Sequence, residues 1–134
     1  MAGIDHLMIN ANNYQASVKF YAWLMPQIGY PEKHEYGGEN PTTGFYGPGG
    51  SLWLSNSATN LRTDNFDKRR VGLREIAFRA DTRAQVDEVA QGIEANGGKI
   101  LDPPQEYPQY APNYYSVFFT DPDGLKLEVV TYSK

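Results

Sequence analysis

The sequence contains no cysteine, and this absence excludes several kinds of chemistry. Without thiols the chain can form no disulfide bond, can bind no metal through thiolates and has no cysteine nucleophile. Because cytosolic and secreted proteins can both lack cysteine, the count says little about the compartment. It does restrict the chemistry of any active site.

Positive charge is also scarce, since 12 Lys and Arg residues stand against 16 Asp and Glu residues, for a formal net charge of −4. Nucleic-acid binding needs clustered basic side chains that neutralise phosphates. The one basic cluster, Lys68–Arg70, is short and follows Asp64 and Asp67, so we interpret it as part of a solvated linker. No nucleic-acid partner is expected.

Long apolar runs and several catalytic motifs are absent as well. The N-terminus, MAGIDHLMINANN, has no basic region followed by a long apolar core, so neither a signal peptide nor a membrane span is expected and a cytoplasmic location is the default. No phosphate-binding loop, GxSxG motif or dinucleotide fingerprint occurs. The 134 residues, of which 40% are hydrophobic and 21% charged, are typical of one soluble globular domain.

The first half of the chain is predicted to form a strand, a helix and three further strands. Alternation in Ile4–Asn10 puts Leu7 and Ile9 on one face and His6, Met8 and Asn10 on the other. Helical spacing follows, with Asn12 or Asn13 as the cap and with Pro26 and Gly29 at the end. Turn residues then separate short strands near Lys33–Tyr36, Thr43–Tyr46 and Ser51–Leu54.

The second half repeats this order after a polar stretch. Gly72–Arg79 is predicted to be a strand, and Thr82 with Gln85 forms a capping box for a helix. A short strand near Lys99–Leu101 is expected to stop at Pro103 and Pro104. The last two strands flank a type I turn at Asp121–Gly124. We therefore divide the chain into module one (1–56), a connection (57–71) and module two (72–134).

The two halves can be aligned as an internal repeat of β-α-β-β-β order. In this alignment His6 corresponds to Glu75, and Leu54 corresponds to Glu128. Glu128 lies among aliphatic residues of a predicted strand. An unpaired buried charge costs several kcal/mol in practice, so Glu128 requires a cation, a hydrogen-bond donor or a proton.

Three segments resemble the vicinal oxygen chelate superfamily, which includes glyoxalase I, extradiol dioxygenases, and bleomycin- and fosfomycin-resistance proteins. They are IDHLMINANN with SVKFYAWLMPQIGY, GLREIAFRADTRAQVDEVAQGIEANGGKI, and YYSVFFTDPDGLKLEVV. The resemblance implies an α+β fold, in which two βαβββ modules form an open cup-like mixed β-barrel with the helices outside (the glyoxalase/bleomycin resistance/dioxygenase fold). It also implies a divalent metal inside the cup and a homodimer.

The resemblance further implies which residues would bind the metal. His6, Glu75 and Glu128 match ligand positions of the family, whereas Leu54 occupies the remaining position and has no donor atom. A set of one histidine and two carboxylates with open positions would suit Mn²⁺, Mg²⁺ or Fe²⁺, with Ni²⁺ and Zn²⁺ as further possibilities. Metal-free alternatives remain open: His6 could be a hydrogen-bonded strand histidine, Glu75 could pair with a neighbouring arginine, and Glu128 could pair with Lys126 or a tyrosine hydroxyl.

Aromatic side chains near the Pro-rich loop are the main candidates for the substrate-binding wall. His34 is expected at the surface or at a cavity rim, and Trp53 and Phe20 are expected in the core. The complete set of predicted substrate-binding residues is Asn10, Leu54, Arg79, Tyr107, Tyr110, Tyr114 and Tyr115.

Two functions are consistent with these features. The first is a metal-dependent enzyme, a lyase or isomerase in preference to an extradiol-type dioxygenase, in which the metal chelates adjacent oxygens of a small substrate. Glu75 or Glu128 would then move a proton as the catalytic residue. The second is a metal-free protein that sequesters a small aromatic or cationic molecule, as the bleomycin-resistance proteins do.

Overall fold

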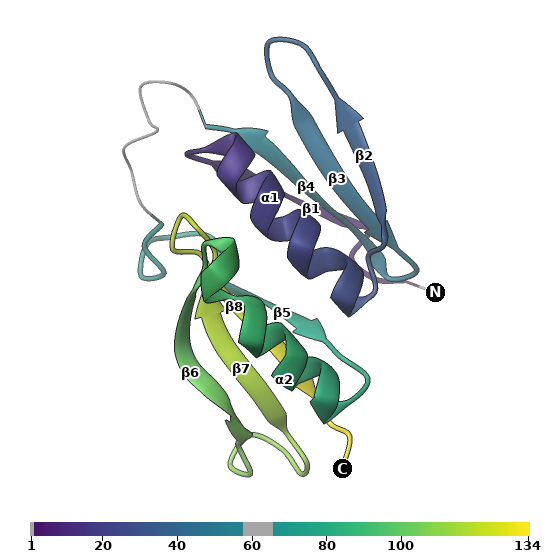
Figure 1. Cartoon of the computed structure of the whole chain (residues 1–134), viewed down its shortest axis with the longest axis vertical. Coiled ribbons are helices and arrows are strands. Elements are labelled where there is room, and N and C mark those ends of the chain that lie inside the picture. The colour runs from purple at the N-terminus through teal and green to yellow at the C-terminus, as the bar shows by residue number, and fades with distance from the viewer. Residues whose placement is uncertain (1, 58–65) are drawn as a thin grey trace. The chain divides into compact units, whose positions relative to one another are not determined.

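The computed structural model describes residues 2–57 and 66–134, and the chain divides into two compact units, Met1–Asn65 (unit 1) and Phe66–Lys134 (unit 2). Residues 58–65 of the predicted connection lie outside the described residues. In each unit a helix lies across one face of a four-stranded sheet (Figure 1). No helix in the described ranges is long and apolar enough to cross a membrane.

Both units have the β-α-β-β-β order that the sequence predicts, which confirms the α+β fold. Unit 1 contains β1 (His6–Ala11), α1 (Tyr14–Leu24), the short 3-10 helix η1 (Met25–Ile28), β2 (Glu32–Tyr36), β3 (Thr42–Gly47) and β4 (Gly50–Asn56). Unit 2 contains β5 (Glu75–Arg79), α2 (Arg83–Gly92), the 3-10 helix η3 (Glu94–Asn96), β6 (Lys99–Glu106), β7 (Tyr115–Thr120) and β8 (Lys126–Thr131).

The two sheets have the same topology. The strand order is β1-β4-β3-β2 in unit 1 and β5-β8-β7-β6 in unit 2. The first and last strands of each unit pair in parallel, and the other neighbours are antiparallel. Two parallel strands must be joined by a crossover connection. In unit 1 the connection from β1 to β4 starts with α1, and in unit 2 the connection from β5 to β8 starts with α2.

Both helices start at caps that the sequence predicts. The Asn13 side chain accepts a hydrogen bond from the amide of Ala16 at 3.1 Å, which selects Asn13 over Asn12 as the cap of α1. Thr82 and Gln85 form the reciprocal capping box at the start of α2. Each cap satisfies amide groups that have no partner within the helix.

One face of each sheet packs on the helix of the same unit, because side chains alternate between faces along a strand. In unit 1 the covered face and α1 contribute buried residues that include Phe20, Tyr21, Phe45, Leu52 and Leu54. In unit 2 the corresponding residues include Val86, Val89, Val117, Phe119, Leu127 and Val129.

We call the other face of each sheet its open face. The strand register gives its members, since paired residues point to the same side. On unit 1 they include His6, Met8, Asn10, Thr42, Gly44, Tyr46, Ser51 and Trp53. On unit 2 they include Glu75, Ala77, Arg79, Ser116, Phe118, Lys126, Glu128 and Val130.

The hairpin between β7 and β8 contains the predicted turn. The amide of Gly124 donates to the carbonyl of Asp121 at 3.0 Å, which closes the four-residue turn. The buried carboxylate of Asp121 also accepts hydrogen bonds from the amides of Asp123 and Leu125. Asp at the first turn position is therefore explained by the hydrogen bonds that its side chain accepts within the turn.

The predicted end of β6 was wrong. The strand continues past Pro103 and Pro104 to Glu106, and its pairing with β7 shifts register between Ile100 and Asp102 and again between Asp102 and Gln105. Proline lacks an amide hydrogen but is tolerated in edge strands and at such irregularities. β6 lies at the edge of its sheet, so the prolines do not end it.

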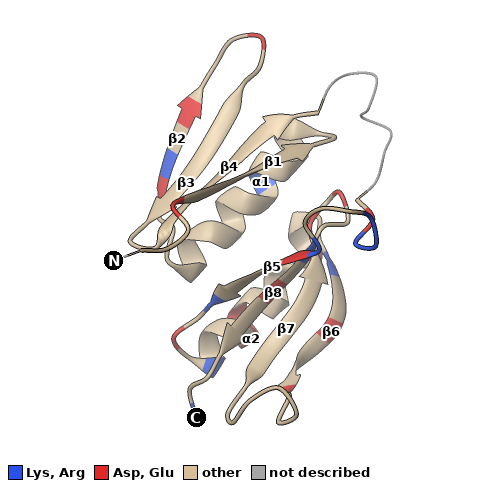
Figure 2. Ribbon diagram, turned by 180° about the vertical axis from the view of Figure 1, so that it is seen from behind, with Lys and Arg blue, Asp and Glu red and all other residues tan. Residues whose placement is uncertain are grey.

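β2 lies at the edge of the unit 1 sheet, in the position that β6 has in unit 2, and it is exposed along its whole length. It carries Glu32, Lys33 and Glu35 in close succession, as the alternating red and blue segments of β2 in Figure 2 show. Charged side chains on an edge strand disfavour pairing with a strand of another chain. We interpret this sequence as protection of the edge.

The turn between β3 and β4 contains a close backbone contact that only glycine permits. A Cβ atom at Gly47 would lie 1.8 Å from the carbonyl oxygen of Gly29, whereas at Gly49 the nearest atom would be the Tyr30 hydroxyl at 3.8 Å. Gly47→Ala should therefore lower the free energy of unfolding by about 1–3 kcal/mol or more, because the backbone has to move.

Gly49→Ala is the matched control and should change stability much less. Urea denaturation of both variants measures the difference. Equal stability of Gly47→Ala and Gly49→Ala would contradict the close packing of η1 against the end of β3.

Candidate functional site

Two carboxylates lie on the open face of unit 2. In the parallel β5–β8 pair, Glu75 is opposite Lys126 and Ala77 is opposite Glu128, so Glu75 and Glu128 are diagonal neighbours on one face. Figure 2 shows charged segments on both strands. The sequence therefore predicted correctly that unit 2 brings these two acids to one face.

Glu75 is incompletely satisfied. Its Oε2 atom is buried and has no hydrogen-bond partner, and the nearest cation is the Lys126 ammonium group, with an Nζ–Oε2 distance of 3.5 Å. Lys126 also lies 4.7 Å from the centroid of the Phe118 ring. Glu75 was considered as a possible partner of a neighbouring arginine, but its ion pair is with Lys126.

Glu128 is almost fully buried, with 3% of its surface exposed, and its Oε2 atom accepts a hydrogen bond from the Tyr114 hydroxyl. Burial raises the pKa of Glu128 above its ordinary value. The hydrogen bond from Tyr114 opposes this rise, and the negative charge of Glu75 adds to it. The tyrosine pairing considered as a metal-free alternative is thus present.

The same contact affects Tyr114. Burial and the hydrogen bond to Glu128 raise the pKa of the Tyr114 phenol well above its ordinary value. Tyr114 therefore stays protonated over the physiological pH range and remains a donor to the carboxylate.

Further aromatic rings pack around Tyr114, the hydrogen-bond partner of Glu128. Tyr107 and Tyr110 are stacked with centroids 5.3 Å apart, and Tyr114 packs edge-on against Tyr110 and Tyr132 at the same centroid distance. Phe118 packs against Tyr107 at 5.4 Å. Three of the tyrosines predicted to line a site, Tyr107, Tyr110 and Tyr114, thus form one cluster beside Glu128.

Phe118 and Tyr132 belong to this cluster but were missed from sequence. Phe118 on β7 is paired with Glu128 on β8. Tyr132 comes four residues after Glu128 in the sequence, and its ring packs against Tyr114. The period-two pattern continued past the end of β8 would have identified Tyr132, and the pairing of β7 with β8 across the predicted turn would have identified Phe118. The predicted Arg79 lies on the same face, with its guanidinium carbon 5.0 Å from the Tyr132 ring centroid.

Tyr115 was wrongly grouped with Tyr114. Its hydroxyl donates to Asp87 of α2 at 2.6 Å, and the guanidinium of Arg83 lies 4.8 Å from its ring centroid. Adjacent residues of a strand point to opposite faces, so Tyr115 contacts the helix while Tyr114 contacts Glu128.

His6 lies on the open face of unit 1 together with Met8 and Asn10, as predicted. Its side chain is half exposed, and Nδ1 is 2.8 Å from a carboxylate oxygen of Asp5. A carboxylate on one ring nitrogen orients the imidazole and leaves the other nitrogen for a further partner. His34 is a half-exposed surface residue whose ring packs on Tyr46.

Leu54 does not line the open face. It is fully buried on the covered face of unit 1, and the register shows why the repeat alignment was one residue out of step. His6 is paired with Ser51 and Met8 with Trp53, just as Glu75 is paired with Lys126 and Ala77 with Glu128. Trp53 therefore corresponds to Glu128, because a shift of one residue exchanges the two faces of a strand.

Trp53 consequently differs from its expected place in the core. It lies on the open face, partly exposed, and packs against Tyr36 and Tyr46. Phe20, the other aromatic residue expected in the core, is fully buried.

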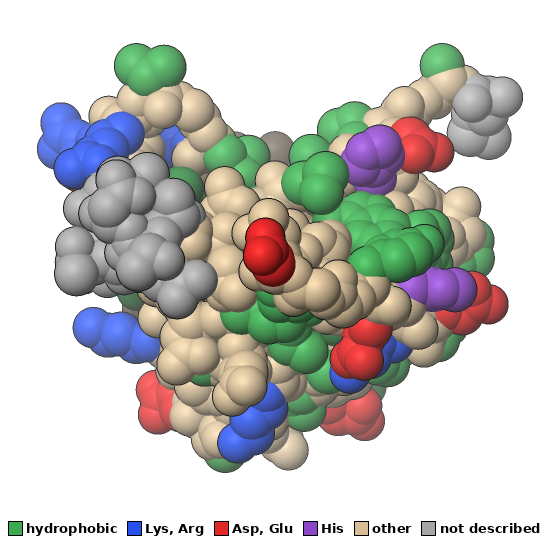
Figure 3. Space-filling view, turned by 90° about the horizontal axis from the view of Figure 1, so that it is seen from above, with side chains coloured by type: hydrophobic (Ala, Val, Ile, Leu, Met, Phe, Trp, Pro, Cys, Tyr) green, Lys and Arg blue, Asp and Glu red, His purple; other side chains and the backbone are tan. Residues whose placement is uncertain are grey.

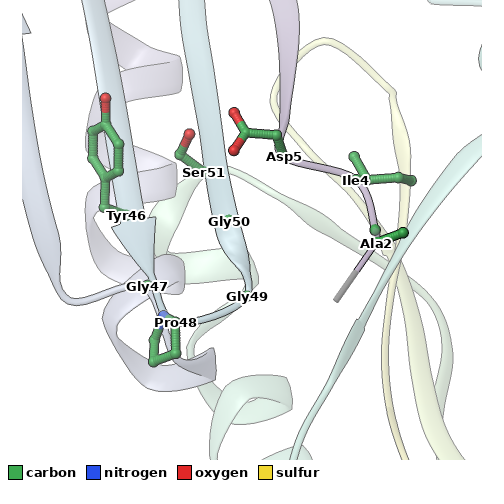
Figure 4. Close-up of a pocket in the computed structure, with 10 residues that line it drawn as sticks. Ala2, Ile4, Asp5, Tyr46, Gly47, Pro48, Gly49, Gly50 and Ser51 are labelled. Carbon is green, nitrogen blue, oxygen red and sulfur yellow. The ribbon is translucent and has the colours of Figure 1, made fainter.

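Two hollows border this region of unit 1. One, of about 510 Å³, lies between the segment before β1 and the β3–β4 turn, and Figure 4 shows the side chains of Asp5 and Ser51 next to each other beside it. The other, of about 490 Å³, lies on the open face itself. It is lined by Asp5, His6, Met8, Tyr36, Thr42, Tyr46, Ser51 and Trp53.

Within either unit, the described residues contain no group of three histidine, aspartate or glutamate side chains that could hold a metal ion. The predicted set of His6, Glu75 and Glu128 draws on both units. Unit 2 alone supplies the two carboxylates, and unit 1 supplies the imidazole.

Comparison with known proteins gives a match to the model of the Glyoxalase/Bleomycin resistance protein/Dioxygenase superfamily over residues 3–129. The uncharacterised protein YqjT of Bacillus subtilis is 27% identical over 132 residues, which cover 97% of this chain and 99% of that protein.

Solved structures show the same similarity. A candidate glyoxalase from Bacillus halodurans is 28% identical with a TM-score of 0.77, over 96% of this chain and 94% of the other. A glyoxalase/bleomycin resistance protein from Albidiferax ferrireducens T118 has the same TM-score at 22% identity, over 96% and 98% of the two chains. The latter similarity concerns the fold.

The environment of Glu128 predicts a specific pH dependence of stability. Its pKa in the folded protein lies above 4.5, so as the pH rises from this value the unfolded state loses its proton first. Stability from this group is complete below pH 4.5 and is lost as the pH rises through the raised pKa, by up to about 1.4 kcal/mol per pH unit. The variant Glu128→Gln should lack this loss in urea denaturation measured with a chelator present.

Removing the Tyr114 hydroxyl, which donates to Glu128, should shift the pKa of Glu128 further from its ordinary value. Tyr114→Phe should raise the pKa of Glu128 further, as measured by carbon NMR titration of the labelled carboxyl group, since the hydrogen bond from Tyr114 lowers it. Tyr115→Phe is the matched control, because its hydroxyl bonds to Asp87. An equal shift in both variants would contradict the assigned contact.

Proposed function

The chain belongs to the Glyoxalase/Bleomycin resistance protein/Dioxygenase superfamily, and on this premise we propose that it is a divalent-metal-dependent enzyme acting on a small oxygenated molecule. Glu75 and Glu128 would hold the metal, with His6 of this chain or of a second copy as the third ligand. The observation that carries the proposal is the buried Oε2 atom of the part-exposed Glu75, which has no hydrogen-bond partner and only the Lys126 ammonium group near it, on the same face as the buried carboxylate of Glu128.

The chemistry of these donors fits such an ion. Two carboxylates that share one face repel each other, and a divalent cation relieves this repulsion more completely than the single charge of Lys126 does. One imidazole and two carboxylates suit Mn²⁺, Mg²⁺ or Fe²⁺, and also Ni²⁺ or Zn²⁺. Trp53, which corresponds to Glu128 in the sheet register, supplies no fourth ligand. The set would therefore leave positions open for substrate, as catalytic sites do.

When bound, the metal would act as a Lewis acid that stabilises negative charge on adjacent substrate oxygens. The chain's own residues would handle the proton. A carboxylate that the metal does not fully engage, Glu75 or Glu128, would remove it from the substrate, and Glu75 is the better candidate because it is the more exposed of the two. Tyr114 would hold Glu128 in place through its hydrogen bond. This division of roles favours lyase or isomerase chemistry over oxygenation.

A second function is favoured by a different observation. The Lys126 ammonium group already lies 3.5 Å from Glu75, and an aromatic residue replaces a ligand at Trp53. These features would suit a metal-free protein that binds a small molecule between aromatic and charged side chains. Metal affinity distinguishes this function from the first.

Titration of Mn²⁺, Fe²⁺, Ni²⁺ and Zn²⁺ into the metal-free protein, together with elemental analysis of protein purified without chelators, tests the proposed metal site. His6→Ala, Glu75→Gln and Glu128→Gln should each weaken the affinity at least about tenfold, because each removes a ligand. His34→Ala, which removes a half-exposed histidine, is the matched control and should leave the metal affinity unchanged. The absence of binding below roughly millimolar concentration, or an unchanged affinity of His6→Ala, would contradict the metal-dependent function.

We also propose a homodimer, which the family resemblance implies. Light scattering should give a mass of twice the 15.0 kDa of the chain. A monomer at high protein concentration would contradict it.

A further inference from the structure

The indole ring of Trp53 lies flat on the open face of unit 1, directly over Gly44 of the neighbouring strand. A Cβ atom built on Gly44 would be 2.7 Å from each of three ring atoms, Cδ2, Cε2 and Cε3. Equal distances to several ring atoms mean that the Gly44 Cα hydrogen points at the face of the indole and not at its edge. Glycine at this position is therefore what allows the ring to lie against the sheet.

Three further contacts hold the ring in this orientation. Its Nε1 atom donates a hydrogen bond to the Ser51 hydroxyl oxygen at 3.1 Å. Tyr46 packs edge-on against it with a centroid distance of 5.4 Å, and Tyr36 is stacked with it at 5.8 Å and an interplanar angle of 24°. We call Trp53, Tyr36 and Tyr46 the aromatic platform. The contacts with Gly44 and Ser51 orient the Trp53 ring within the platform without any ligand.

The platform forms one wall of the hollow of about 490 Å³ on this face, which has the size of typical small-molecule pockets, about 300–1,000 Å³. Tyr36 and Met8, which are 62% and 61% exposed, put large apolar side chains in the lining where a ligand can reach them. Figure 3 shows the two histidine side chains, in purple, bordering hydrophobic side chains in green. His6, Asp5, Ser51 and Thr42 provide the polar part of the lining.

We infer that the open face of unit 1 binds a planar aromatic ring bearing a hydroxyl or carboxylate group, with the ring stacked on the aromatic platform and the polar group beside His6 and Ser51. The inference names a class of substrate for the proposed enzyme, and it rests on that function only in placing the substrate next to His6.

The ring geometry favours an aromatic ligand over an aliphatic one. The exposed Tyr36 ring, which is stacked with Trp53, gives a ligand an aromatic surface on which to stack, and aromatic pairs contribute beyond the area that they bury. The tyrosine edges beside it carry partial positive charge that complements the face of a second ring.

The polar lining favours an oxygen-bearing substituent. The Ser51 oxygen accepts the hydrogen bond from Trp53, so its own hydrogen can be donated to a ligand oxygen. His6 has one ring nitrogen on Asp5. The other nitrogen can contact the ligand oxygen in the metal-free protein, or bind the proposed metal beside it.

The test compares two probes that differ only in the ring. The intact protein is titrated with 4-hydroxybenzoate and with trans-4-hydroxycyclohexanecarboxylate by isothermal titration calorimetry, with a chelator present and then with Mn²⁺. The aromatic probe should bind saturably, and the saturated probe should bind roughly 2- to 10-fold more weakly or not at all, because it cannot stack.

Variants of the platform locate the binding. Gly44→Ala should lift the indole from the sheet and weaken 4-hydroxybenzoate binding by a similar factor, although residue 44 itself offers no group to the ligand. Trp53→Leu should do the same. Gly49→Ala, whose Cβ would meet nothing closer than 3.8 Å, is the matched control and should bind as the wild type does. Circular dichroism checks that each variant is folded.

The outcomes separate this inference from the proposed function. Aromatic selectivity without metal binding supports the platform and contradicts the metal-dependent enzyme. Metal binding with equal affinity for both probes, or no saturable binding of 4-hydroxybenzoate at millimolar concentration, overturns the inference and leaves the metal site standing. If neither Gly44→Ala nor Trp53→Leu folds, the comparison of the two probes on the wild-type protein still decides.

Discussion

The parallel pairing of the first and last strands in each unit is the constraint on which the candidate site depends. It sets Glu75 opposite Lys126 and Ala77 opposite Glu128 in unit 2, and His6 opposite Ser51 in unit 1. Side chains alternate along a strand, so this register decides which of them share the open face and which pack on the helix. The helix caps and the β7–β8 turn support the register by fixing where each element begins.

The two carboxylates on unit 2 have different surroundings despite sharing one face. Glu128 is buried and receives a hydrogen bond from Tyr114, while Glu75 has a buried oxygen without a hydrogen bond and a lysine nearby. In the proposed enzyme Glu128 would be held in place by the hydrogen bond from Tyr114, and Glu75 would be the better placed of the two carboxylates to contact the substrate.

Equivalent positions in the two units carry different chemistry. Where unit 2 has Glu128, unit 1 has Trp53, and where unit 2 has Glu75, unit 1 has His6. The two βαβββ units of the chain thus carry different groups: unit 2 has the two carboxylates, and unit 1 has the aromatic platform and an imidazole. Gly44, which lies opposite Trp53 across β3 and β4, permits this difference because a larger residue would occupy the space of the indole.

The sequence by itself determined the order of elements, the cap at Thr82, the cap of α1 to within Asn12 or Asn13, and the Asp121–Gly124 turn, because these depend on local propensity and on short periodic patterns. The shared face of Glu75 and Glu128 was expected from the family resemblance. It did not determine the end of β6, where edge position overrides the proline signal, or the faces of Tyr115 and Leu54. Those depend on pairing register between distant strands, and an alignment error of one residue reverses the outcome. Only the tertiary structure could show that Trp53 takes the place assigned to Leu54 and that Tyr114 is the partner of Glu128.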